Sequence, residues 1–249
     1  MKKTLIALFF MFISLVSFSE IKKGSLAAFS MVNNSCNINK YTAKDYVQNG
    51  LISMLDGIEN GGVGVHDTDA HIWTNLKDTG LSIGNSSMIF GEDYMMLGTT
   101  IYGNIMTSHE IEALGSECDY TVEFLVETGD TTWNTPMMLW DSLNRTSLIS
   151  FMHVPKRIFY HNNVIIKSSI YMNIGETCLF TFVREGTKGY GYINGEFIGV
   201  KDIDNTYIGT RMYLYASAHK QKRIAIYNRP LTQEEISYNY SIDKSRFNL

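Results

Sequence analysis

Cysteine and proline are both scarce in this chain, and each scarcity excludes something. Only 3 of the 249 residues are cysteines, Cys36, Cys118 and Cys178, and only 3 are prolines. Three cysteines always leave one unpaired, so the count excludes a disulfide-framework domain and a zinc site built of cysteines. Either all three thiols are free, or Cys118 and Cys178 form one disulfide bond. With 20 glycines in the chain, we expect turns built on Gly and Asn instead of Pro.

Charge is sparse as well, and slightly negative. Lys and Arg number 21 and Asp and Glu number 25, which gives a net charge of −4 at pH 7. A general nucleic-acid binder needs a basic surface that neutralises phosphates, so this balance argues against nucleic acid as a partner. Hydrophobic residues make up 45% of the chain, which excludes a disordered protein, and the aromatic content of 12% is typical of half-buried strands.

Long hydrophobic runs are missing outside the first twenty residues. Two lysines near the start precede an apolar segment over residues 5–16, and the small residues Ser17 and Ser19 follow it. This pattern predicts a signal peptide over residues 1–19, and hence a secreted or cell-surface protein. The alternative is an uncleaved membrane anchor, but the apolar segment is shorter than the ~20 residues of a membrane span. We expect no stable membrane span after signal removal.

The rest of the chain divides into a polar segment and a long all-β region. Residues 20–45 are polar and aperiodic, with a cluster of asparagines, and are interpreted as an N-terminal arm or linker. Over residues 46–249, short apolar segments alternate with Gly, Asn and Asp, as in a chain of short strands. Within residues 119–127, Tyr, Val, Phe and Val point to one face while Thr and Glu point to the other. Residues 46–249 are therefore predicted to form one β-domain.

Two local signals place a turn and a helix. The Asn-Gly dipeptide at 194–195 fits a type I′ turn, and the hairpin around it sets Tyr192 opposite Phe197. The segment Thr-Gln-Glu-Glu at 232–235 forms a capping box, which predicts a short helix over about residues 233–241. Many short strands and one terminal helix predict an all-β fold, a jelly-roll β-sandwich of two antiparallel sheets with a short C-terminal helix.

Three segments of the predicted domain resemble a known superfamily. They are Gly50–Leu76 (GLISMLDGIENGGVGVHDTDAHIWTNL), residues 191–199 (GYINGEFIG) and Arg223–Tyr240 (RIAIYNRPLTQEEISYNY). Together they resemble the laminin-G-like branch of the concanavalin A-like lectin/glucanase superfamily, over most of residues 46–249. The resemblance implies a jelly roll whose concave face and rim loops commonly bind carbohydrate or protein, in some members with calcium at the rim. Other members are hydrolases, so the function has to be argued from the site.

The carboxylates closest to a glucanase pattern are Glu117, Asp119 and Glu123. Retaining glucanases of the superfamily use two Glu flanking an Asp on one strand, with the reacting carboxyls about 5 Å apart. Here six residues of strand separate the two Glu, which corresponds to about 20 Å. We therefore expect these side chains to form the outward polar face of a strand. On this ground we expect a binding module with no catalytic residues, and not an enzyme.

A candidate metal site lies in the segment His-Asp-Thr-Asp-Ala-His at residues 66–71. In an extended segment, Asp67, Asp69 and His71 share one face. Carboxylates suit calcium and imidazoles suit softer ions, so the mixture specifies neither metal well. We expect no cofactor, with calcium on these three residues as one alternative. The other interpretation is a polar surface loop in which the Asp side chains cap turns.

A sugar-binding site needs an aromatic platform beside polar groups, because a sugar presents both apolar faces and hydroxyls. Trp133 with Asn134, in a polar turn-like segment, and Tyr160 with His161 meet this need. The alternative for each aromatic ring is packing in the core or at the rim of the sandwich. These four residues are the predicted ligand-binding residues.

The basic run His-Lys-Gln-Lys-Arg at residues 219–223 is either a solvated loop or a rim that binds an acidic glycan.

Taken together, the sequence predicts a secreted, non-catalytic binding module that recognises a glycan on the concave face or rim loops of the sandwich. A protein-interaction or structural surface module is the alternative, and a glycoside hydrolase comes third. The expected partner is a glycan or a surface protein.

Overall fold

The structure is a computed structural model, and the described residues lie within the compact unit Tyr41–Leu249. They are residues 41–77, 82–84, 86–97, 103–105, 119–129, 137–140, 147–150, 159–161, 164–166, 173–203, 211–214 and 219–249.

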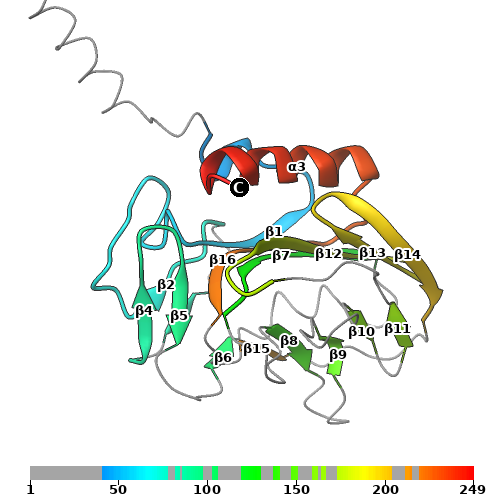
Figure 1. Cartoon of the computed structure of the whole chain (residues 1–249), viewed down its shortest axis with the longest axis horizontal. Coiled ribbons are helices and arrows are strands. Elements are labelled where there is room, and N and C mark those ends of the chain that lie inside the picture. Colours follow the sequence, from blue (N-terminus) through cyan, green and yellow to red (C-terminus); the bar gives the residue numbers. More distant parts are fainter. Residues whose placement is uncertain are drawn as a thin grey trace, which may run out of the picture. The chain divides into compact units, whose positions relative to one another are not determined.

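Two antiparallel sheets build this unit, with one helix on the outer side of the larger sheet (Figure 1). The prediction of an all-β sandwich with a C-terminal helix is confirmed. The larger sheet has the order β14-β13-β12-β7-β16-β5-β4, and β1 also pairs with β16. Its strands are β1 (Leu51–Asp56), β4 (Met88–Phe90), β5 (Met95–Leu97), β7 (Tyr120–Glu127), β12 (Thr177–Glu185), β13 (Lys188–Ile193), β14 (Glu196–Asp202) and β16 (Lys220–Tyr227).

The smaller sheet has the order β11-β10-β9-β8-β15-β6, and a two-stranded ribbon pairs with neither sheet but contributes Trp73 and Ile83 to the main apolar core. The strands of the smaller sheet are β6 (Gly103–Ile105), β8 (Met137–Trp140), β9 (Ser147–Ser150), β10 (Phe159–His161), β11 (Val164–Ile166) and β15 (Arg211–Leu214). The ribbon consists of β2 (Ile72–Trp73) and β3 (Ile83–Gly84), and the helices are the 3-10 turn η1 (Ala43–Asp45) and α3 (Gln233–Arg246).

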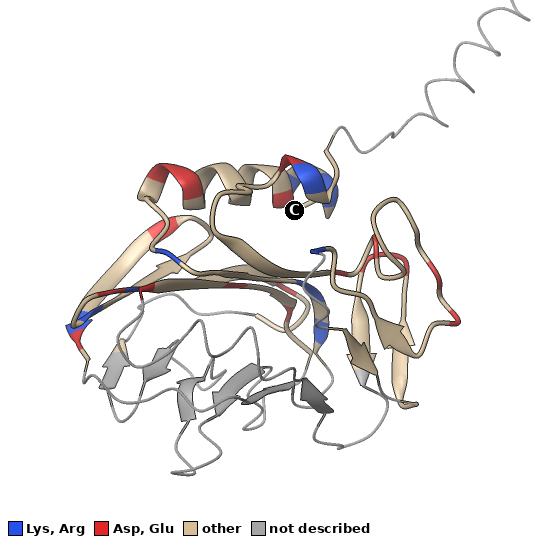
Figure 2. Cartoon of the chain, turned by 180° about the vertical axis from the view of Figure 1, so that it is seen from behind, with Lys and Arg blue, Asp and Glu red and all other residues tan. Residues whose placement is uncertain are grey.

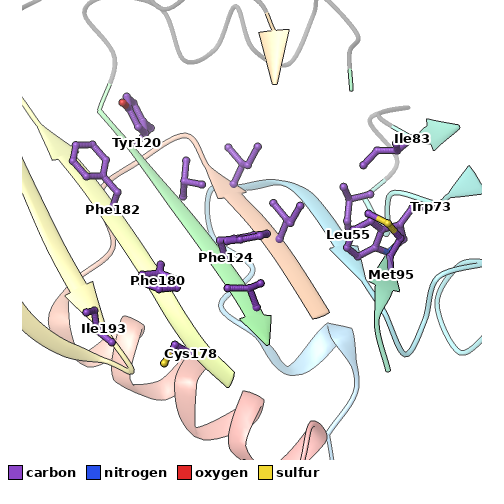
Figure 3. Close-up of a cluster of buried hydrophobic side chains, with 14 of the residues drawn as sticks. Leu55, Trp73, Ile83, Met95, Tyr120, Phe124, Cys178, Phe180, Phe182 and Ile193 are labelled. Atoms are coloured by element: carbon purple, nitrogen blue, oxygen red, sulfur yellow. The ribbon is translucent and has the colours of Figure 1, made fainter. Parts of the chain in front are cut away.

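The alternation predicted for residues 119–127 is present in β7. Val122 and Phe124 are buried in the main apolar core, together with Phe182 of β12 and Ile224 of β16. Figure 3 shows Phe124 and Phe182 among the side chains of this core. Cys178 belongs to the same core as a free thiol, so it packs as a small apolar side chain and is not part of a disulfide bond. The opposite faces of β7, β12 and β16 are covered by α3, which packs through a second apolar cluster. The central strands β7, β12 and β16 are therefore buried on both faces, as their nearly continuous apolar sequences require.

The hairpin and the helix start form as predicted. Asn194 and Gly195 have φ angles of 52° and 80°, as a type I′ turn requires, and the rings of Tyr192 and Phe197 pack 5.6 Å apart. A capping box starts α3 at residues 232–235. No helix in the described part of the chain is long and apolar enough to cross a membrane.

Helix α3 is longer than predicted, since it ends at Arg246 and not near residue 241. The helical periodicity of apolar residues is not visible in the sequence at this end. The reason is that the buried positions include the charged residues Asp243 and Arg246, and charged residues ordinarily face solvent. The first turn carries acidic residues and the last turn carries basic ones, which complements the helix dipole (Figure 2).

Candidate functional site

Two of the four predicted sugar-binding residues lie in the smaller sheet. Trp133 and Asn134 lie outside the described residues. Tyr160 and His161 lie in β10, where Tyr160 pairs with β9 and β11 and His161 pairs with β11. Sugar binding by these four residues therefore stays a prediction.

The predicted metal segment forms an exposed loop that is held by local hydrogen bonds. The Asp67 carboxylate accepts a bond from the backbone N–H of Asp69 at 2.9 Å, and the Asp67 backbone exchanges two bonds with the Asn60 side chain. These contacts match the turn-capping interpretation of the segment. Across the residues that the structure describes, no group of three or more His, Cys, Asp or Glu side chains is arranged to hold a metal ion. Calcium on Asp67, Asp69 and His71 stays a prediction without that support.

The structure describes two of the three candidate hydrolase carboxylates, Asp119 and Glu123. Asp119 accepts a backbone bond from Gly186 at 2.6 Å, and Glu117 lies outside the described residues. Glu123 lies on the outward face of β7, as predicted, but α3 covers this face, so the Glu123 side chain is fully buried. Burial raises the pKa of the Glu123 carboxyl to about 7, although Arg223 lowers it.

Arg223 is the centre of a buried ionic network between β16, β7 and α3. Its guanidinium donates two bonds to the Asp243 carboxylate, at 2.8 and 2.7 Å, and one to Glu123 at 2.9 Å. It also stacks on the ring of Tyr46, whose hydroxyl donates to Asp243 at 2.7 Å. Because all three charged side chains are fully buried, this network and not a solvated salt bridge fixes α3 to the sheet.

A second buried arginine joins the end of α3 to the start of the domain. Arg246 donates to both oxygens of Asp56, at 2.5 and 3.2 Å, and to Glu59 at 2.9 Å. The Asp56 carboxyl is fully buried, and this burial raises its pKa. Arg246 thus connects the C-terminal turn of the helix to β1 and to the loop that follows it.

The basic run at residues 219–223 is neither a solvated loop nor a free basic rim. Most of it lies in β16, where Lys220 pairs with Glu127 at 2.7 Å and Lys222 pairs with Asp93 at 2.6 Å. Arg223 belongs to the buried network. The three cations are therefore neutralised inside the domain.

Among the described residues, a groove of about 340 Å³ lies beside β1. Four segments that are far apart in sequence build it: η1 and the turn after it, β1, the glycine-rich loop, and residues 76–77. Buried apolar side chains form the floor, and two lysines and a glutamine form the rim. The lining residues are Ala43, Lys44, Gln48, Leu51, Met54, Val63, Leu76 and Lys77.

One carboxylate holds two opposite walls of this groove. Glu59 accepts the backbone N–H of Ala43 with one oxygen and the backbone N–H of Gly64 with the other, each at 3.0 Å. Arg246 in turn fixes Glu59. The η1 turn and the glycine-rich loop are therefore held in place by a buried, charge-assisted contact.

The third wall is fixed by Asn75 and by the backbone of its neighbour. The Asn75 side-chain oxygen accepts the N–H groups of Met54, at 2.9 Å, and of Lys77, at 3.1 Å. The backbone N–H of Leu76 donates to the Met54 carbonyl at 2.8 Å. These bonds also cover the free edge of β1. The groove is therefore formed before any ligand arrives.

Two lysines, Lys44 and Lys77, line the rim of the groove. Lys77 Nζ donates to Gln48 Oε1 at 3.3 Å, and the Gln48 amide donates to the carbonyls of Ala43 and Tyr46. Sequence reasoning missed this site, because Lys44 lies in the segment interpreted as an arm and Lys77 is 33 positions away. The only hint was the segment 50–76, which carries the resemblance and also supplies four of the lining residues.

Comparison with known proteins gives a fold but no family. No family model and no curated protein matches the chain. Among solved structures, a Trypanosoma rangeli sialidase in complex with sialic acid is 11% identical, with a TM-score of 0.61, over 78% of this chain and 33% of the sialidase. The binding domain of Paraclostridial Mosquitocidal Protein 1 is also 11% identical, with a TM-score of 0.58, over 77% of this chain and 52% of that one.

The expectation that the chain is not an enzyme is wrong. It rested on the spacing of Glu117 and Glu123, but the structures that share this fold include sialidases, which are glycoside hydrolases. The chain spans about a third of the length of those sialidases. A missing glucanase pattern therefore does not exclude an enzyme. At 11% identity the likeness shows the fold alone, a β-sandwich of the kind found in sialidases and in a toxin binding domain.

Proposed function

We propose that this chain is an exported, carbohydrate-binding β-sandwich of the laminin-G-like kind, which holds a glycan in the groove beside β1. The observation that carries the proposal is the preformed groove with an apolar floor and a rim of hydrogen-bond donors. A sugar presents an apolar ring face as well as hydroxyls, and this arrangement complements both. Because Glu59 and Asn75 fix the walls, little ordering cost opposes binding.

The structural neighbours support the same class of ligand. The T. rangeli sialidase was solved in complex with sialic acid, so one chain that contains this fold binds a glycan component. Tyr160 and His161, which lie in β10, are a predicted second contact together with Trp133 and Asn134. Loss of glycan binding in Trp133→Ala would support that second contact.

A glycan array probed with the full chain tests the proposal. Val63 lines the groove, so Val63→Trp should fill it and reduce the array signal. Val65 belongs to the same exposed loop without lining the groove, which makes Val65→Trp the matched control. Equal melting temperatures of the two variants would show that both are folded. A full array without signal would contradict the proposal.

A protein-interaction module is the second candidate, because the glycine-rich loop and the ribbon next to it expose apolar side chains. Val63, Val65 and Ile72 are 43%, 51% and 53% exposed. Exposed apolar residues that gather on one loop are typical of a protein contact. If this is the function, Val65→Ser should abolish partner binding, whereas a glycan-binding groove should tolerate it.

A further inference from the structure

We propose that the groove selects a sugar that carries a carboxylate, and that the ammonium groups of Lys44 and Lys77 bind this carboxylate. The inference rests on the proposed function and deepens it by naming the ligand class. The sequence patterns and the fold do not point to these two lysines, but their position on the rim of the groove does.

The first step is the state of the cations in the part of the chain that the structure describes. Several cations elsewhere in the described domain are paired with carboxylates, namely Lys220 with Glu127, Lys222 with Asp93 and Arg229 with Glu235. Lys44 and Lys77 take part in no salt bridge with a described carboxylate. In a chain whose net charge is −4, the rim therefore concentrates two unneutralised positive charges at one groove.

The second step is the state of the acids next to the rim. Glu59 uses its oxygens on Ala43, Gly64 and Arg246. Asp45, beside Lys44, accepts bonds from the backbone and hydroxyl of Thr42, and these bonds lower the pKa of its carboxyl. Both nearby acids are thus held in local bonds, which leaves the lysine ammonium groups to an incoming anion.

The third step is the surroundings of the Lys77 ammonium group. Lys77 is half-buried, and its bond to Gln48 uses one of its three donors, so two remain for a ligand. The buried Leu51 and Met54 exclude water from the floor. A charge-assisted hydrogen bond is stronger at such an edge than in bulk water.

The fourth step is size and shape. A volume of about 340 Å³ lies at the lower end of the range for small-molecule sites, so the groove fits a terminal sugar and not a long polysaccharide. The apolar floor suits a ring face or a methyl group, and the rim suits one carboxylate. A terminal acidic sugar such as sialic acid has both features.

Calorimetric titration of the full chain with 3′-sialyllactose, lactose and 3′-sulfolactose tests this inference. We expect 3′-sialyllactose to bind about tenfold more tightly than lactose at low salt, and the difference to shrink as ionic strength rises. Lys44→Gln and Lys77→Gln should each weaken the binding of 3′-sialyllactose by about three- to tenfold and leave the affinity for lactose unchanged. Lys201→Gln, at another exposed lysine of the larger sheet, should have no effect on either ligand.

The outcomes separate the inference from the function on which it rests. If 3′-sialyllactose and lactose bind equally and the lysine variants change nothing, the acidic-sugar assignment is overturned while carbohydrate binding stands. If 3′-sulfolactose binds as tightly as 3′-sialyllactose, the groove recognises charge alone and the carboxylate assignment is overturned. If no glycan binds under any condition, the proposed function itself fails.

Discussion

Replacing Arg223 with methionine should destabilise the domain far more than any loss of a surface ion pair. Arg223 is fully buried and donates three hydrogen bonds to Asp243 and Glu123. Methionine fills much of the arginine volume, so the principal change is that two buried carboxylates lose their shared cation. Removing one partner of a buried pair costs about 3–5 kcal/mol.

Thermal unfolding measures this cost directly. In a domain of about 200 residues, 1 kcal/mol lowers the melting temperature by about 2–4 °C, so Arg223→Met should lower it by about 6–20 °C. Lys188→Met is the control, because Lys188 pairs with Asp202 on the surface, where the two side chains are 49% and 82% exposed. Such a pair contributes about 0–1 kcal/mol.

A combined variant tests the physical reason for the loss. Adding Glu123→Gln and Asp243→Asn to Arg223→Met removes the unpaired charges, so part of the lost stability should return. The reasoning is refuted if Arg223→Met destabilises no more than Lys188→Met. It is refuted equally if the combined variant is less stable than Arg223→Met alone.

Three further predictions concern pH, the helix cap and the hairpin turn. The Glu123 pKa of about 7 is above the ordinary value of 4.5, so the protonated carboxyl favours folding, and this stabilisation is lost as the pH rises from about 4.5 through 7. Between pH 5 and pH 8 the melting temperature of the wild type should therefore fall relative to that of Glu123→Gln. Melting temperatures that change with pH in the same way for both proteins would contradict this. Thr232→Ala removes the side chain that accepts the Glu235 N–H and should cost about 1 kcal/mol in urea unfolding, whereas Thr232→Ser should cost little. Gly195→Ala should lower the free energy of unfolding by about 1 kcal/mol, because Gly195 has a φ of 80°, which alanine adopts only with backbone strain. The added Cβ would meet only ordinary van der Waals contacts, so the strain is the principal cost. An unchanged urea midpoint would contradict this prediction.

The parts of the fold that could be predicted from sequence are those set by local chemistry. The alternation in β7, the Asn194-Gly195 turn and the capping box at residues 232–235 each depend on neighbours within a few positions. These signals placed the main strands, one hairpin and the start of α3. They were sufficient for the fold class.

The buried ionic network could not be predicted, because charged residues are ordinarily exposed. Arg223 lies 100 positions from Glu123 and 20 from Asp243. Their contact exists only when α3 covers the outer face of β7 and β16. The same cause made the helix seem to end near residue 241.

The groove escaped sequence analysis for a related reason. Lys44 and Lys77 are ordinary surface lysines in the sequence, and Glu59 is one carboxylate among 25 acidic residues. They become a site only when Glu59 joins Ala43 to Gly64 and Gln48 binds Lys77. The segment from residue 41 to residue 45 thus contributes a wall of the groove, although it was interpreted as part of a polar arm.

The central claim is that a glycan occupies the groove beside β1, and an amide chemical-shift map tests it most directly. The uniformly ¹⁵N-labelled chain would be titrated with 3′-sialyllactose, and the backbone amide shifts would be assigned by residue. The account predicts that the largest shifts fall on Ala43, Lys44, Gln48, Gly64 and Lys77, and that Val63→Trp removes them. Saturable shifts confined to other residues, or none at all, would contradict it.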